Sequence, residues 1–169
     1  MGIDPGLATV GYGIVEYVGN KFLGSDYGAI ITPPHTPNGE RLWQIHDELE
    51  KLLKYYKIET AAVEKLYFNT NTTTAISVAE ARGVIQLALT KNSIPYSEYT
   101  PLQVKQSVTG YGRAEKNQVM SMVKMLLNLQ KIPRPDDAAD GLALAICHAH
   151  CTGSFAMKSL NLKDLNRKG

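Results

Sequence analysis

The spacing of apolar residues changes along this chain, from short strand-like runs in the first thirty residues to helical steps farther on. β-Branched and aromatic residues fill 10–17 and 21–31, and Gly19-Asn20 between them is a two-residue turn signal, which predicts a hairpin. From residue 39, leucine and isoleucine recur at three- and four-residue steps, as they do on one face of a helix. These criteria predict strands at 1–3, 10–17, 21–31, 61–63 and 95–99, and helices at 39–56, 72–89, 101–108, 115–129 and from 136 past 150.

The predicted elements follow the order βββαβαβααα. Three leading strands can pair as an antiparallel meander, and strands that alternate with helices add to the same sheet in parallel. Thr100 before Pro101 reads as the N-cap of the helix at 101–108. We therefore predict one α/β domain over 1–155, with a central mixed five-stranded sheet flanked by helices, and a polar, basic, flexible tail over 156–169.

Composition is that of a globular protein. Hydrophobic residues make up 44% and charged residues 20% of the 169 residues, a balance ordinary for one folded domain. The chain has no run of eighteen apolar residues, so we expect no membrane span. Its start lacks the basic and apolar stretches of a signal peptide. Trp43 is expected to pack, partly buried, on the first helix.

The two cysteines, Cys147 and Cys151, lie one helical turn apart in the last predicted helix. This spacing does not suggest a disulfide framework and favours a reducing, cytoplasmic setting. Both cysteines are expected on the buried stripe of that helix, whereas His148 and His150 diverge around it. Because zinc sites usually draw ligands from more than one segment, we interpret the pair as core cysteines.

Charge is distributed unevenly, although the net charge is only +2. Residues 1–100 carry 8 Lys/Arg against 11 Asp/Glu, and residues 101–169 carry 10 against 5. A basic C-terminal portion suits a polyanionic partner such as nucleic acid. The same imbalance is also common on an ordinary solvated surface, so charge alone leaves both interpretations open.

Four acids stand at the edges of predicted core elements. Asp4 ends the first strand and Glu64 ends the strand at 61–63. Asp137 and Asp140 are three residues apart in the last helix, so their side chains share one face. That face continues through Leu144 and predicts two carboxylates pointing toward the sheet.

A buried carboxylate is unfavourable unless it is paired, hydrogen-bonded or bound to metal. An oxygen-only set of four acids favours Mg²⁺ or Mn²⁺ over zinc, and paired divalent ions can hydrolyse a phosphodiester. Taken singly, Asp4 could be a turn residue and Asp137 a helix-capping acid. Spacing alone does not establish that the four acids meet.

Several short motifs occur in order along the chain, to about residue 150. They are Gly2-Ile3-Asp4-Pro5-Gly6, Thr9-Val10-Gly11-Tyr12-Gly13, Val63-Glu64, Ala81-Arg82-Gly83, Val104-Lys105-Gln106, Ala114-Glu115-Lys116 and Asp137-Ala138-Ala139-Asp140-Gly141-Leu142-Ala143. Taken together they resemble the RuvC family of Holliday junction resolvases over nearly the whole chain. A lone G-I-D-P-G would be weak, because actin-like ATPases have similar phosphate loops.

The resemblance implies an RNase H-like fold and a homodimer that cuts two opposed strands of a four-way DNA junction in recombination and repair. It implies dependence on Mg²⁺, for which Mn²⁺ can substitute, with two ions per active site. It leaves open a branch-migration motor complex as a partner. One departure is that only Met1 precedes the Gly2–Gly6 motif, which predicts a short first strand that could position Asp4 less firmly.

The resemblance also assigns residues. It implies that four acids bind the metal and activate the attacking water: Asp4, Glu64, Asp137 and Asp140. It implies a catalytic and DNA-handling role for Lys105 and Lys116, and Arg113 beside them is a further candidate for binding phosphates. Tyr67 matches the aromatic residue that touches junction bases, with Phe68 as its neighbour. Ala75, Ala79 and Gly83 form a smooth ridge that suits a dimer contact, although alanine packing inside one domain explains it equally well.

Three other functions remain open at this point. An RNase H-like nuclease with the same acids could act on RNA–DNA hybrids or flaps. An actin-like ATPase built around the first glycine-rich turn would need a second phosphate loop of the D-x-G kind, which we do not find. A catalytically silent junction-binding protein would not need all four acids, which are present.

Overall fold

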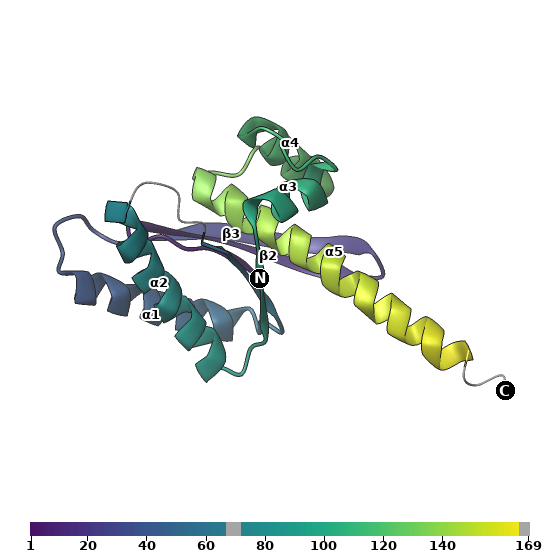
Figure 1. Cartoon of the computed structure of the whole chain (residues 1–169), viewed down its shortest axis with the longest axis horizontal. Helices are drawn as coiled ribbons and strands as arrows, with labels where there is room; N and C mark the ends of the chain where they lie inside the picture. The colour runs from purple at the N-terminus through teal and green to yellow at the C-terminus, as the bar shows by residue number, and fades with distance from the viewer. Residues whose placement is uncertain (67–71, 166–169) are drawn as a thin grey trace.

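The computed structural model describes residues 1–66 and 72–165, and its elements follow the predicted order (Figure 1). The strands are β1 (Gly2–Asp4), β2 (Thr9–Val18), β3 (Lys21–Ile31), β4 (Ala61–Glu64) and β5 (Tyr96–Tyr99). The helices are α1 (Asn38–Tyr55), α2 (Thr72–Lys91), α3 (Pro101–Thr109), α4 (Lys116–Leu126) and α5 (Asp136–Leu165).

The five strands form one mixed sheet in the order β3-β2-β1-β4-β5. The first three strands are antiparallel, whereas β4 pairs in parallel with both β1 and β5. β1 is short but central, and Met1 extends its pairing. The Met1 nitrogen donates to the Thr60 carbonyl over 3.0 Å, and the Ala62 N–H donates to the Met1 carbonyl over 2.7 Å. Asp4 is therefore the last residue of a strand that is paired on both sides.

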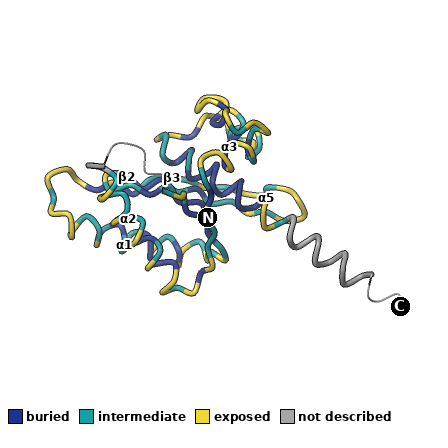
Figure 2. Tube along the Cα trace, viewed as in Figure 1, coloured by how far each residue is buried: buried dark blue, intermediate teal, exposed yellow. Residues whose placement is uncertain are grey.

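Helices cover both faces of the sheet (Figure 1). α1 and α2 pack on one face through a buried cluster that includes Ile45, Leu49 and Ile85. α3, α4 and α5 cover the other face through a second cluster that includes Val123 and Leu142. The buried positions run along the central strands and the first half of α5 (Figure 2). The result is a three-layer α/β/α arrangement with the sheet in the middle.

Local capping signals set several helix ends. The Thr100 side chain accepts from the Gln103 N–H, and the Gln103 side chain accepts from the Thr100 N–H, so the predicted N-cap is confirmed as a capping box. α4 ends at Leu126, three residues before the predicted end at 129. Asn128 has a positive φ of 51°, and a residue in that left-handed conformation ends a helix.

α5 lies directly on the central strands because glycines leave room for its backbone. A Cβ at Gly11 would overlap the carbonyl of Asp137, and a Cβ at Gly13 would overlap the backbone of Leu142. On the helix side, a Cβ at Gly141 would stand 2.6 Å from the carbonyl carbon of Tyr12. Such close approach is possible only where no side chain intervenes. These contacts bring the first turns of α5 to the end of β1.

Two sequence predictions about burial are wrong. Trp43 is 68% exposed, because Ile45 and Leu49 turn toward the sheet and a residue two positions before Ile45 points away from it. Cys147 is buried as predicted, but Cys151 is exposed. A step of four residues exceeds one helical turn of about 3.6 residues, so Cys151 is rotated away from the buried position of Cys147. His148 is instead the buried neighbour.

Among the described residues, no helix is both long and apolar enough to cross a bilayer. α5 continues to Leu165, through most of the segment that we expected to form a tail. The division of the chain at residue 155 remains a prediction.

Candidate active site

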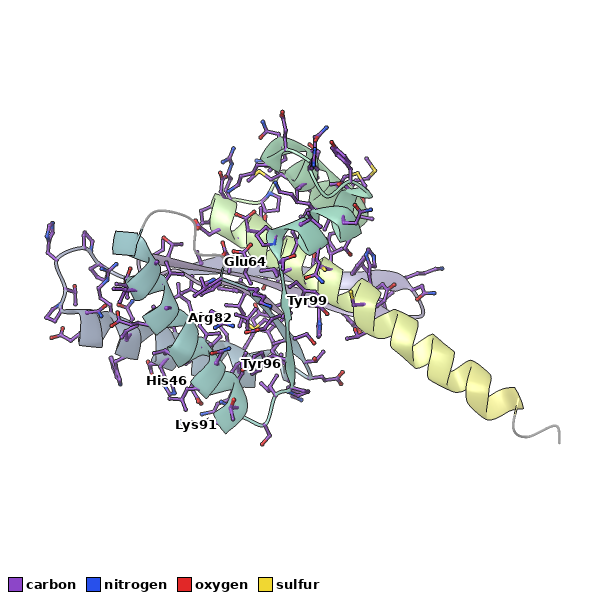
Figure 3. All side chains as sticks on the ribbon, in the orientation of Figure 1. His46, Glu64, Arg82, Lys91, Tyr96 and Tyr99 are labelled. Atoms are coloured by element: carbon purple, nitrogen blue, oxygen red, sulfur yellow. The ribbon has the colours of Figure 1, made fainter. Side chains whose placement is uncertain are left out.

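Asp4 and Glu64 end neighbouring parallel strands and face α5. Gly2 faces α5, since a Cβ there would overlap Gly141, and side chains two residues apart share a face of the sheet. Asp4 therefore faces α5 as well. The same rule places Glu64 on the face of Ala62, which belongs to the core cluster under α5. Figure 3 shows Glu64 at the edge of the sheet beside the start of α5.

The carboxyl groups of Asp4 and Glu64 share a hydrogen bond in which Asp4 is the donor. Burial, followed by the charges of Glu64, Asp140 and Asp137, raises the pKa of Asp4 to about 8. Burial also raises the pKa of Glu64, although the hydrogen bond from Asp4 works in the opposite direction. The protonated Asp4 thus keeps two buried carboxylates from facing each other as anions.

Asp137 and Asp140 come from the first two turns of α5. Both act electrostatically on Asp4, which places them near the end of β1. The structure therefore brings together the four acids that the sequence singled out. This is the arrangement in which several oxygen ligands from separate elements can hold divalent cations.

Lys116, at the first residue of α4, neutralises part of this negative charge. Its Nζ donates to Asp140 Oδ2 over 3.0 Å and lies 3.6 Å from Asp136 Oδ2. Burial disfavours the ammonium, but the contacts with Asp140 and Asp136 outweigh it and raise the pKa of Lys116. The Lys116 charge also works to lower the pKa of Glu64. Lys116 is thus part of the acidic site.

Asp136 is a site residue that the sequence reasoning missed. It lies 3.6 Å from Lys116 Nζ and also forms an ion pair with Arg134. The sequence contained a signal for Asp136, because this acid directly precedes Asp137 at the start of the last predicted helix. We read that position only as the beginning of the helix, where an acid is favourable for electrostatic reasons.

Two other predicted DNA-binding residues lie on α3 and directly after it. Lys105 is half-buried on α3, and Arg113 is exposed in the connection between α3 and α4. Within the described part of the chain, no ion pair joins either residue to the four acids. Tyr67 and Phe68 lie outside the described residues.

The predicted dimer ridge lies on α2. Ala75 and Ala79 are half-buried, and Gly83 is exposed. Among the described residues, none outside the local helix backbone has an atom within 4 Å of the position that a Cβ of Gly83 would take. Ile76 and Leu87 are also exposed on this helix. The side of α2 at Gly83 therefore does not pack inside the domain.

The donor set suits a hard divalent cation, because carboxylate oxygens are the ligands that Mg²⁺ prefers. Burial together with three neighbouring acids makes Asp4 hold a proton near neutral pH, which is what an acidic site does when cationic charge is insufficient. In the part of the chain that the structure describes, no three such groups yet converge as ligands of one ion. Asp4 is hydrogen-bonded to Glu64, and Asp140 is paired with Lys116 instead.

The family model described as crossover junction endodeoxyribonuclease RuvC matches residues 1–148. The chain belongs to the RuvC family. A RuvC from Alkaliphilus oremlandii is 56% identical over 155 residues, covering 92% of this chain and 94% of that protein. A RuvC from Desulfitobacterium hafniense is 54% identical over 169 residues, and the match covers all of this chain and 96% of the Desulfitobacterium protein.

A solved RuvC structure has the same fold. The Thermus thermophilus RuvC in complex with a Holliday junction substrate superposes with a TM-score of 0.80 at 36% identity, covering 88% of this chain and 90% of that one. The predicted family, the RNase H-like fold and the activity of a crossover junction endodeoxyribonuclease are confirmed. RuvC proteins are metal-dependent nucleases.

Proposed function

We propose that this chain resolves four-way DNA junctions by paired, symmetric, metal-dependent hydrolysis, with Asp4, Glu64, Asp137 and Asp140 as its metal ligands. The observation that carries the proposal is that Asp4 and Glu64, at the ends of the neighbouring parallel strands β1 and β4, face Asp137 and Asp140 from the first turns of α5. Burial and the three other acids together raise the pKa of Asp4 to about 8. A bound cation would stabilise such a site, because its charge offsets both the cost of burying the Asp4 carboxylate and the repulsion among the four acids.

We propose two Mg²⁺ ions per active site, with Mn²⁺ as a substitute. When bound, such ions activate a water molecule and stabilise the leaving oxygen. The contribution of the chain is to hold the four carboxylates on three elements, β1, β4 and α5, and to accept the loss of the Asp4 proton as the ions bind. Metal binding is therefore expected to release a proton near neutral pH.

Lys116 is proposed to act on both the acids and the DNA. Its ammonium lies 3.0 Å from Asp140 Oδ2, so it can contact a phosphate that approaches the carboxylates. Lys105 and Arg113 are proposed to bind neighbouring phosphates, which would give the complex its dependence on salt. Tyr67, or its neighbour Phe68, is proposed to contact the bases at the junction.

The active form is proposed to be a homodimer joined through α2, with Ala75, Ala79 and Gly83 at the contact. The exposed Ile76 and Leu87 on the same helix support an apolar interface there. A two-fold dimer would present two active sites to the two opposed strands of a junction. A cytoplasmic location and a branch-migration motor complex as partner are likewise expected.

The test is cleavage of an end-labelled four-way junction, with Mg²⁺ or with chelator, beside linear duplex and RNA–DNA hybrid. We expect paired nicks on the junction alone, lost with chelator and with Asp4→Asn, while junction binding is kept. Asp47→Asn is the matched control, because Asp47 is a surface acid that pairs with Lys51 on α1. Cleavage of the RNA–DNA hybrid instead would show that the same four acids act on another substrate. Binding of the junction without cleavage would indicate a junction-binding protein.

A further inference from the structure

The turn that follows Asp4 has little support from the sheet itself. Asp4 is the last residue of β1 and pairs with Gly11 on β2, while the parallel pairing of β1 with β4 ends at Ile3. Residues 5–8 connect β1 to β2 outside the strands. Whatever holds this turn therefore helps to decide where the Asp4 carboxyl group lies.

Thr32, directly after the end of β3, holds the turn with two hydrogen bonds. Its backbone N–H donates to the Ala8 carbonyl over 3.1 Å, and its hydroxyl donates to the Leu7 carbonyl over 2.6 Å. Thr32 is only 2% exposed, so water has little access to replace these bonds. The Leu7 side chain also packs against the core under α1 and α2.

Arg41, in the first turns of α1, fixes the direction of the Thr32 hydroxyl. Its Nε donates to Thr32 Oγ1 over 2.8 Å. A guanidinium N–H can only donate, so the hydroxyl oxygen is the acceptor and its single hydrogen is left for the Leu7 carbonyl. The contacts Arg41–Thr32–Leu7 thus connect α1 to the turn beside Asp4.

We infer that Thr32 is a positioning residue for Asp4, an inference that rests on the function proposed above. Valine has nearly the shape of threonine but neither donates nor accepts a hydrogen bond. In Thr32→Val the Leu7 carbonyl and the Arg41 N–H lose their hydrogen-bond partner in a buried place. The turn is then expected to shift so that these groups can reach other partners. Serine keeps the hydroxyl and preserves both bonds. Residues that orient metal ligands in this way typically change metal affinity or activity by about 10–100-fold when replaced.

The experiment compares Thr32→Val and Thr32→Ser with the wild type, and uses Thr90→Val, at an exposed threonine on α2, as the matched control. Two quantities are measured: the Mg²⁺ or Mn²⁺ concentration that half-saturates thermal stabilisation of the DNA-free protein, and the concentration that half-saturates junction cleavage. We expect Thr32→Val to raise both by about 10-fold, with cleavage recovering at high metal concentration. Thr32→Ser and Thr90→Val should match the wild type.

Unchanged half-saturating concentrations in Thr32→Val would overturn the inference, even if the variant melts at a lower temperature. If Thr32→Val does not fold, Arg41→Met removes the donor to the hydroxyl and is tested in the same way, and an unchanged metal dependence there overturns the inference equally. A wild-type protein that binds metal but does not cut junctions would contradict the proposed function instead. The comparison of metal-dependent stabilisation would still decide the role of Thr32.

Discussion

Gly11 on β2 lies against the backbone carbonyl of Asp137 on α5 so closely that no Cβ fits between them. Two residues farther along β2, Gly13 has the same relation to the backbone of Leu142. The helix therefore rests on the strand backbone itself, and this contact holds Asp137 next to the end of β1. The acidic site depends on the absence of side chains on β2 as much as on the carboxylates.

We expect Gly11→Ala to push the start of α5 away from the sheet. Such overpacking typically lowers the free energy of unfolding by about 1–3 kcal/mol, and misplacing a reacting group by about 1 Å can slow a reaction about 100-fold. Thermal unfolding and junction cleavage measure the two effects. Gly39→Ala is the control, since in the described part of the chain nothing beyond the local helix backbone lies within 4 Å of the position that its Cβ would take. Equal behaviour of the two variants would show that the close contact is not required.

The contribution of Asp4 to the stability of the metal-free protein should fall as pH rises from about 4 to about 8. The folded state holds the Asp4 proton more tightly than the unfolded chain, because burial and the neighbouring acids raise the pKa of Asp4 to about 8. The folded state therefore binds more protons than the unfolded state in this window, and stability falls with rising pH. Melting temperatures from pH 5 to pH 9 in chelator should fall less steeply for Asp4→Asn than for the wild type. Parallel slopes would contradict the proposed environment of Asp4.

His148 should have the opposite effect at acidic pH. It bridges Thr60 Oγ1 at 2.8 Å and the Tyr99 hydroxyl at 3.0 Å, and burial lowers its pKa to about 4. Between about pH 6.5 and 4 the unfolded chain therefore binds the extra proton, and stability falls as pH decreases. His148→Asn should weaken this dependence of the melting temperature on pH. His35→Asn, at an exposed histidine, should retain it.

Lys116→Gln should separate metal binding from cleavage. Removing the ammonium that lies 3.0 Å from Asp140 Oδ2 removes a cation that competes with Mg²⁺, so less Mg²⁺ should half-saturate the thermal stabilisation. Cleavage should nevertheless slow by about 100-fold, the usual effect of losing one electrostatic contact to the reacting group. Lys124→Gln on the same helix is the control. Weaker metal binding in Lys116→Gln would contradict the competition.

Leu87→Glu should convert the proposed dimer to a monomer without unfolding the domain. Leu87 is 60% exposed on α2, so the isolated domain tolerates a charge there, while an apolar interface does not. Leu102→Glu is matched in exposure, also 60%, but lies on α3 in the opposite layer. Sedimentation or light scattering should show a smaller particle only for Leu87→Glu. A Leu87→Glu dimer would place the interface elsewhere.

Local signals in the sequence determined most of the elements. The Gly19-Asn20 turn, the Thr100 cap and the helical steps of apolar residues each depend on neighbours within a few positions, and each element that they predicted is present. The motif resemblance in turn identified the family and the four acids. Such signals can be recognised in the sequence because they depend on residues only a few positions apart.

Only the tertiary structure decided burial and electrostatic partnership. Trp43 is exposed because of how α1 faces the sheet, and Cys151 is exposed although Cys147, one turn earlier on α5, is buried. The close contact of Gly11 with α5 and the pairing of Lys116 with Asp136 and Asp140 each join residues twenty or more positions apart. Spacing along the chain does not encode such distances, because they are set by how whole elements pack against one another.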